Sequence, residues 1–139
     1  MSDTSPLRGL CTISFYAADH EAAKRWYTEL LGVEPYFQRP GYVEFRIGDY
    51  QHELGIIDSA YAPPGATDGP AGAVAHWHVE DLQGMFDKLL ALGAKEHQPP
   101  KSWGDAGFAT ASVVDPFGNV LGIMYNPHYL EVRDAAPSA

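Results

Sequence analysis

Two histidines separated by one residue, His76 and His78, have the type and spacing that most directly suggest chemistry in this sequence. They lie in a run from 73 to 79 that is typical of a strand, where side chains two positions apart point to the same face. Imidazoles bind divalent metals and transfer protons near neutral pH. A carboxylate on another strand, for which Glu53 is the candidate, would complete a metal site or a metal-free acid–base pair.

A simpler role fits the same residues, in which they line a wet cavity or hydrogen-bond to a ligand. We favour this role, because histidines spaced by two often arise by chance. The sequence has no Gly-x-Ser-x-Gly, no phosphate-binding glycine loop and no Cys-x-x-Cys. Its single cysteine, Cys11, excludes an intramolecular disulfide and is expected to face a helix rather than act as a catalytic thiol.

Composition narrows the function classes further. The chain has 139 residues and a formal net charge of -9, which argues against nucleic acid because phosphate binding needs clustered Lys and Arg. No apolar run approaches the roughly 18 residues of a membrane span, and the first residues lack the features of a signal peptide. We therefore expect a cytoplasmic protein with no membrane partner, whose charge tolerates a cationic ligand.

The first half of the chain predicts one strand, one helix and three further strands. The helix is expected from Asp19, an N-cap candidate, to Leu31, because apolar residues recur at helical spacing and Gly32 follows. Alternation and turn signals place the strands at 9–17, 34–38, 42–47 and 50–57.

The second half repeats this order after a Gly- and Pro-rich stretch. Asp81 is expected to cap a helix over 81–92, and it lies 62 positions after Asp19. An Asp-Pro-x-Gly-Asn turn at 115–119 should join the last two strands as a hairpin. The expected strands are 73–79, 95–98, 108–114 and 120–125.

The repeated order predicts an α+β fold of two paired βαβββ modules. They should form a curved, eight-stranded mixed sheet with the helices outside and a concave cavity within. We expect one domain over 1–139, with modules at 9–57 and 74–129, a linker at 58–73 and a tail at 130–139.

Three stretches together resemble a known family. The first is Ala18-Asp19, followed by residues 26–27 and 30–33 of the predicted helix. The second is Val79-Glu80-Asp81-Leu82, followed by residues 92–94. The third is the turn at 115–119. The chain is similar over about 10–129 to the vicinal oxygen chelate superfamily, which includes glyoxalase I, bleomycin-resistance proteins and extradiol dioxygenases. The resemblance implies the fold, but one scaffold hosts many functions.

The resemblance also implies where a divalent metal would be held. The family takes one ligand, typically His, Glu or Gln, from each of four strands, and these positions correspond to Thr12, Val74, Glu53 and Gly122. Of these, Glu53 alone is a good ligand, whereas a catalytic ion needs three or four. We therefore expect no cofactor, and a divalent metal is disfavoured.

We accordingly predict a protein that binds a small organic molecule in the concave cavity. Most candidate ligand-binding residues follow from alternation along the strands, while Gly122 is expected to widen the cavity and Trp103 is an aromatic residue in a loop. The candidates are Thr12, Ser14, Tyr16, Glu53, His76, His78, Trp103, Gly122 and Met124. Filling the cavity by Gly122→Phe should block binding while the fold stays intact.

Several alternatives stay open. A metal-dependent lyase or dioxygenase of the glyoxalase type could use a displaced site at Glu53, His76 and His78. A histidine with Glu53 could instead catalyse acid–base chemistry without metal. His128 and Tyr129, after the last strand, could cap the cavity or contact another subunit, and the resemblance implies a homodimer.

Overall fold

The computed structural model describes residues 10–65, 69 and 74–135. The first module contains one helix, α1 (His20–Leu31), and four strands, and it ends in a short 3-10 turn at Ser59–Tyr61. Its strands are β1 (Thr12–Ala17), β2 (Phe37–Arg39), β3 (Tyr42–Ile47) and β4 (His52–Asp58).

The second module repeats this order and adds a helix after its last strand. Its helices are α2 (Leu82–Ala91) and the additional α3 (Pro127–Ala135). Its strands are β5 (Ala75–His78), β6 (Lys95–Ser102), β7 (Ala109–Val114) and β8 (Val120–Tyr125). Much of the predicted linker, 66–68 and 70–73, lies outside the described residues.

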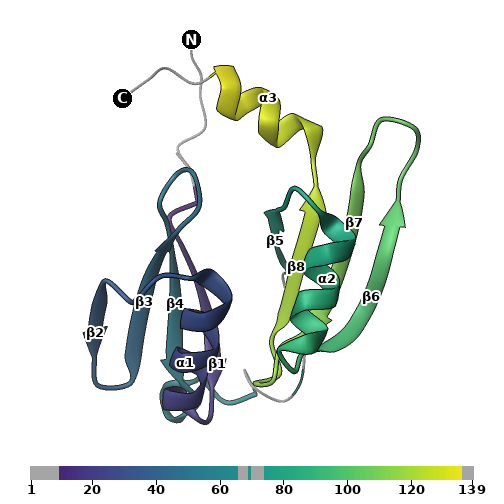
Figure 1. Ribbon diagram of the computed structural model, residues 1–139. Coiled ribbons are helices and arrows are strands. Elements are labelled where there is room, and N and C mark those ends of the chain that lie inside the picture. The colour runs from purple at the N-terminus through teal and green to yellow at the C-terminus, as the bar shows by residue number, and fades with distance from the viewer. Residues whose placement is uncertain (1–9, 66–68, 70–73, 136–139) are drawn as a thin grey trace.

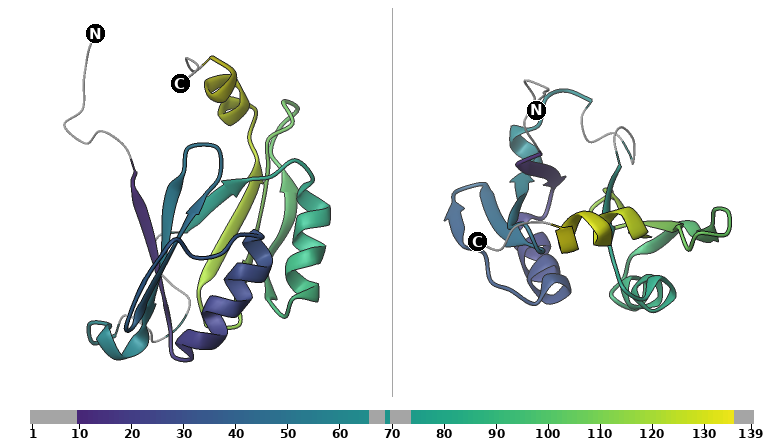
Figure 2. Two further views of the ribbon diagram at one scale, coloured as in Figure 1. Left: turned by 60° about the vertical axis from the view of Figure 1, so that its left-hand side comes forward. Right: turned by 90° about the horizontal axis from the view of Figure 1, so that it is seen from above.

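Each module forms its own four-stranded mixed sheet, and Figure 1 and the view from above in Figure 2 show the two modules side by side. The strand orders correspond, β1-β4-β3-β2 and β5-β8-β7-β6, and in both sheets the first strand pairs with the last in parallel. The α+β fold of two βαβββ modules is therefore confirmed. Its eight strands are hydrogen-bonded as two sheets of four.

The predicted helix ends are confirmed. The Asp19 carboxylate accepts from the backbone N–H of Ala22 at 3.1 Å, and the Asp81 carboxylate accepts from Gly84 at 3.0 Å. Gly32 ends α1 in the left-handed region with φ of 72°, which glycine adopts without a steric penalty. Both helices therefore begin after a capping aspartate, as expected from the sequence.

Alternation along the strands separates a buried face from an outer face. The buried face packs against α1 and α2, and includes Phe15, Leu54, Ile56, Ala111, Val113 and Ile123. Trp26 and Trp77 are partly buried and pack against this core. The neighbouring residues in the strands, including Thr12, Glu53, His76 and Met124, therefore belong to the outer face.

The predicted turn at 115–119 joins the two modules at one end. The Asn119 side-chain amide donates to the Tyr16 carbonyl at 2.9 Å and accepts from the Tyr16 N–H at 3.4 Å. The Tyr27 hydroxyl donates to the Asp115 carboxylate at 2.5 Å, and the Trp26 indole donates to the Leu92 carbonyl at 2.8 Å. The turn is therefore a hairpin that also fastens β1 and α1.

Three local features differ from the sequence prediction. The sequence predicted no helix after the last strand and a tail at 130–139, yet α3 forms over Pro127–Ala135. Strand β6 continues through Pro99 and Pro100 to Ser102, with register shifts that an edge strand tolerates. Cys11 precedes β1 and is exposed, so the expectation that it faces a helix is wrong.

Candidate functional site

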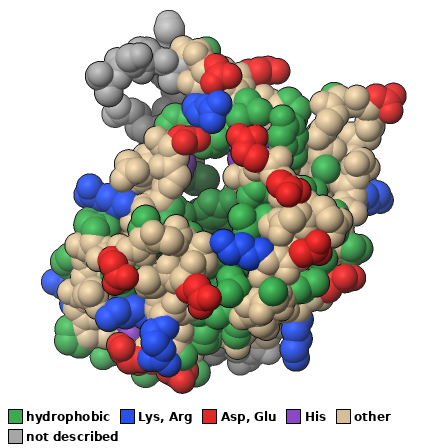
Figure 3. Space-filling view, viewed as in Figure 1, with side chains coloured by type: hydrophobic (Ala, Val, Ile, Leu, Met, Phe, Trp, Pro, Cys, Tyr) green, Lys and Arg blue, Asp and Glu red, His purple; other side chains and the backbone are tan. Residues whose placement is uncertain are grey.

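A cavity of about 530 Å³ lies where the two modules meet, and we call it the seam cavity. It lies between the edge strands β1 and β5, which are in contact through the rings of Phe15 and Trp77, 6.3 Å apart. Its lining comes from both modules and from α3, and Figure 3 shows the molecule hollowed between the modules. The lining residues used below are Asp49, Glu53, His76, His78, Glu80, Met124, Tyr129 and Arg133.

Glu53 brings an ionised carboxylate to this cavity. It accepts from the Thr12 hydroxyl at 2.8 Å and from the Tyr36 hydroxyl at 2.8 Å. Hydrogen bonds from Thr12 and then Tyr36 lower the pKa of Glu53, because they favour the charged form. Tyr36 also donates to Glu44, and the Arg46 guanidinium lies 4.1 Å from its ring centroid. Glu53 therefore remains a charged acceptor at neutral pH.

His76 faces the seam cavity, but Gly122 does not. The two residues are partners across β5 and β8, and Gly122 is buried beneath the imidazole. A Cβ at Gly122 would lie 2.7 Å from His76 Cδ2 and 2.8 Å from the Ala75 carbonyl oxygen. Gly122 thus lets β5, β8 and the imidazole approach closely. Gly122 is absent from the cavity lining, and with this packing we expect Gly122→Phe to destabilise the fold rather than leave it intact.

His78 lies deeper in the seam, between aromatic rings and backbone. Its ring is stacked on Tyr129, with centroids 4.8 Å apart and planes 10° apart, and lies 5.1 Å from Tyr125. Its Nδ1 accepts from the backbone N–H of Asn126 at 3.1 Å. These contacts hold the imidazole in a single orientation.

The other predicted residues divide between the cavity and the outer faces. Met124 lines the seam cavity, and Thr12 reaches it through Glu53. Ser14 and Tyr16 lie on the outer side of β1, outside the cavity lining. Trp103 is 48% exposed beyond the end of β6, where its indole donates to Thr110. The structure therefore brings together Glu53, His76, His78 and Met124, with Thr12 beside them.

The residues present do not fit a divalent metal. At the positions that the resemblance implies, Thr12 donates to Glu53, Gly122 has no side chain, and Val74 offers no ligand atom. Among residues 10–65, 69 and 74–135, no group of three His, Cys, Asp or Glu side chains could hold a metal ion. The displaced site at Glu53, His76 and His78 is therefore not assembled in this chain.

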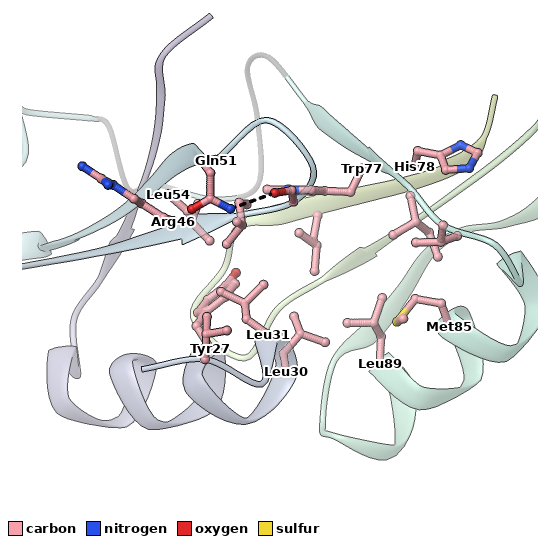
Figure 4. Close-up of a pocket in the computed structure, with 16 residues that line it drawn as sticks. Tyr27, Leu30, Leu31, Arg46, Gln51, Leu54, Trp77, His78, Met85 and Leu89 are labelled. Atoms are coloured by element: carbon pink, nitrogen blue, oxygen red, sulfur yellow. Dashed lines mark hydrogen bonds between the residues drawn. The ribbon is translucent and has the colours of Figure 1, made fainter. Parts of the chain in front are cut away.

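A second cavity, of about 330 Å³, opens on the helix side of the seam. Figure 4 shows apolar side chains from both helices around it, among them Leu30, Leu31 and Leu89. It shares four residues with the lining of the seam cavity, namely Ile47, Gly48, Trp77 and His78. The two cavities therefore approach each other from opposite sides of the seam.

The sequence prediction missed the cavity residues that α3 supplies. Tyr129 and Arg133 line the seam cavity together with Asp49 from the turn between β3 and β4. The available signal was the position of Tyr129 directly after the last strand, which left a cap or a subunit contact open. Tyr129 lines the cavity of its own chain, and a subunit contact stays a prediction.

Comparison with known proteins identifies the family. The sequence profile described as "Glyoxalase/Bleomycin resistance protein/Dioxygenase superfamily" matches residues 9–123. No curated protein sequence matches the chain significantly. In the part that the structure describes, no helix is long and apolar enough to cross a membrane.

Solved structures share the fold at low sequence identity. A glyoxalase-related enzyme from Fulvimarina pelagi is 22% identical, with a TM-score of 0.69 over 87% of this chain and 90% of that one. A lactoylglutathione lyase from Agrobacterium tumefaciens is 18% identical, with a TM-score of 0.66 over 87% and 96%. The bleomycin resistance determinant encoded on the transposon Tn5 is 21% identical, with a TM-score of 0.61 over 86% and 98%.

Proposed function

The chain belongs to the glyoxalase/bleomycin resistance protein/dioxygenase superfamily, and from this premise we propose that it binds a small organic molecule in the seam cavity without a divalent metal. One observation carries the proposal. Glu53 from the first module and His76, His78 and Met124 from the second line one cavity of about 530 Å³. This volume lies within the range of small-molecule sites, roughly 300–1,000 Å³.

The lining indicates the chemistry of the ligand. Among the described residues of the lining, carboxylates outnumber cations, because Asp49, Glu53 and Glu80 face one guanidinium, that of Arg133. An anionic ligand is therefore disfavoured, and a neutral or cationic one is favoured. Met124 and Trp77 supply apolar contact area, while Glu53 can accept from an N–H or O–H of the ligand.

A thermal-shift screen of neutral and cationic organic molecules tests this function. A ligand at about a hundredfold excess over its Kd stabilises the folded state by roughly 2.7 kcal/mol, which raises Tm. Met124→Arg places a long cation in the cavity, so we expect it to abolish the shift. Trp103→Ala removes an exposed aromatic outside the lining, so it should leave the shift unchanged.

The reverse pattern would contradict this assignment. If Trp103→Ala abolished the shift and Met124→Arg preserved it, the ligand would lie near Trp103 beyond the end of β6, outside the seam cavity. The homodimer that the resemblance implies also remains a proposal. The outer faces expose Tyr36, Phe37 and Trp103, and light scattering would measure the mass of the particle in solution.

A further inference from the structure

Helix α3 leaves the second module and reaches back to the first. The Tyr129 hydroxyl donates to the Asp49 carboxylate at 2.6 Å, and the Arg133 guanidinium lies 3.9 Å from the same carboxylate. Asp49 belongs to the turn between β3 and β4, so α3 spans the seam, as Figure 1 shows. No residue of α3 is buried. Besides the Tyr129 ring, which is stacked on His78 and lies 5.9 Å from the Tyr50 ring, exposed contacts with Asp49 hold the helix in place.

The imidazole of His78 lies directly under this helix. Its Nδ1 accepts a hydrogen bond from the backbone N–H of Asn126, so Nδ1 carries no hydrogen. In the neutral ring the hydrogen must then be on Nε2, which makes Nε2–H a donor. The Tyr129 ring, stacked on the imidazole, covers one of its faces.

His78 Nε2 is the atom that this arrangement leaves unexplained. It is buried, and it has no hydrogen-bond partner among the described residues. A buried donor without an acceptor disfavours the state that buries it, because the donor has lost its hydrogen bond to water. A ligand or water that reached this atom would give Nε2–H an acceptor. The contacts at Asp49 thus favour the state in which α3 covers His78, and the unsatisfied donor disfavours it.

We propose that α3 is a lid on the seam cavity, held shut through Asp49, and that His78 Nε2–H under it donates to a carbonyl oxygen of the ligand once the lid opens. The assignment of the ligand group rests on the proposed function. A neutral acceptor suits the site, because Asp49, Glu53 and Glu80 oppose an anionic acceptor. The lid itself rests only on the contacts of α3.

Labelling of histidines with diethyl pyrocarbonate, read by mass spectrometry, tests the lid without any ligand. The reagent acylates accessible imidazole nitrogens, so exposed His76 should react fast and His78 slowly. Asp49→Ala removes the hydrogen bond and the ion pair of α3 with the turn, leaves the ring contact between Tyr50 and Tyr129, and should speed the labelling of His78 by about fivefold or more. Tyr129→Phe keeps the stacked ring but loses its hydrogen bond, and should give a smaller increase.

Glu131→Ala, an exposed change on the same helix, is the matched control and should leave the labelling of His78 unchanged. Two results would overturn the lid. Either His78 reacts as fast as His76 in the unaltered chain, or Asp49→Ala does not change its rate. A ligand found by the screen would then still support the seam cavity, so failure of the lid and failure of the proposed function are distinguishable.

The acceptor role is tested by two neutral probes of equal size. Acetophenone carries a carbonyl oxygen, and ethylbenzene does not. We expect acetophenone, added to the Asp49→Ala variant, to shift the Nε2 nitrogen resonance of His78, and ethylbenzene to leave it in place. Equal shifts from both probes, or none from acetophenone up to its solubility limit, would refute donation to a carbonyl. The labelling result would stand independently.

Discussion

Replacing Asp115 with alanine is expected to lower the free energy of unfolding by roughly 3 to 5 kcal/mol. Asp115 is 3% exposed and accepts from the Tyr27 hydroxyl at 2.5 Å, from Phe117 N at 2.9 Å and from Asn119 N at 2.8 Å. Its removal leaves the hydroxyl of fully buried Tyr27 and backbone N–H groups without their acceptor. Burial and then Asp115 raise the pKa of Tyr27, so this hydroxyl is neutral and needs that acceptor.

Chemical denaturation measures this loss, and Asp81→Ala is the matched control. Asp81 caps α2 and, like Asp115, accepts a hydrogen bond from a backbone N–H. Because Asp81 is exposed, its removal should cost about 1 kcal/mol of stability. Equal losses of unfolding free energy in the two variants would show that the contact of Asp115 with Tyr27 does not hold the modules together. A similar loss in Tyr27→Phe would be unexpected, because that change removes only one of the hydrogen bonds.

Gly122→Ala is expected to destabilise the fold by about 1 to 3 kcal/mol, in the range of overpacked cores. The new Cβ would lie 2.8 Å from the Ala75 carbonyl oxygen and 2.7 Å from His76 Cδ2. The imidazole can turn away, but the carbonyl belongs to the backbone of β5. Strand β5 must therefore shift against β8, which also disturbs His78 in the same strand.

A double-mutant cycle separates the two contacts. If the imidazole supplies part of the clash, Gly122→Ala should cost less in a His76→Ala background than in the unaltered chain. The clash with Ala75 should persist in both backgrounds. A Gly122→Ala variant as stable as the unaltered chain would contradict the close packing of β5 on β8.

Much of the fold could be predicted because its signals are local. Asp19 and Asp81 cap their helices through their own side chains, and Gly32 ends α1 through its own backbone conformation. Alternation along a strand is also local, and it correctly assigned His76 and His78 to the face opposite Trp77. These features need no knowledge of which strands become neighbours.

The candidate site was less predictable because it depends on contacts between distant residues. The approach of His76 to Gly122 follows from the pairing of β5 with β8, which alternation does not specify. The role of Tyr129 depends on Asp49, 80 positions away. Helix α3 lacks an apolar face and is held by exposed contacts, so periodicity could not reveal it.

Elemental analysis of protein purified without a chelator or a metal-affinity tag tests the central claim most directly. Binding without a divalent metal predicts Zn, Ni, Fe and Mn well below one ion per chain, because Thr12, Val74 and Gly122 do not provide the missing ligands beside Glu53. A content close to one such ion per chain, lost in Glu53→Ala, would contradict the account and favour a metal-dependent enzyme.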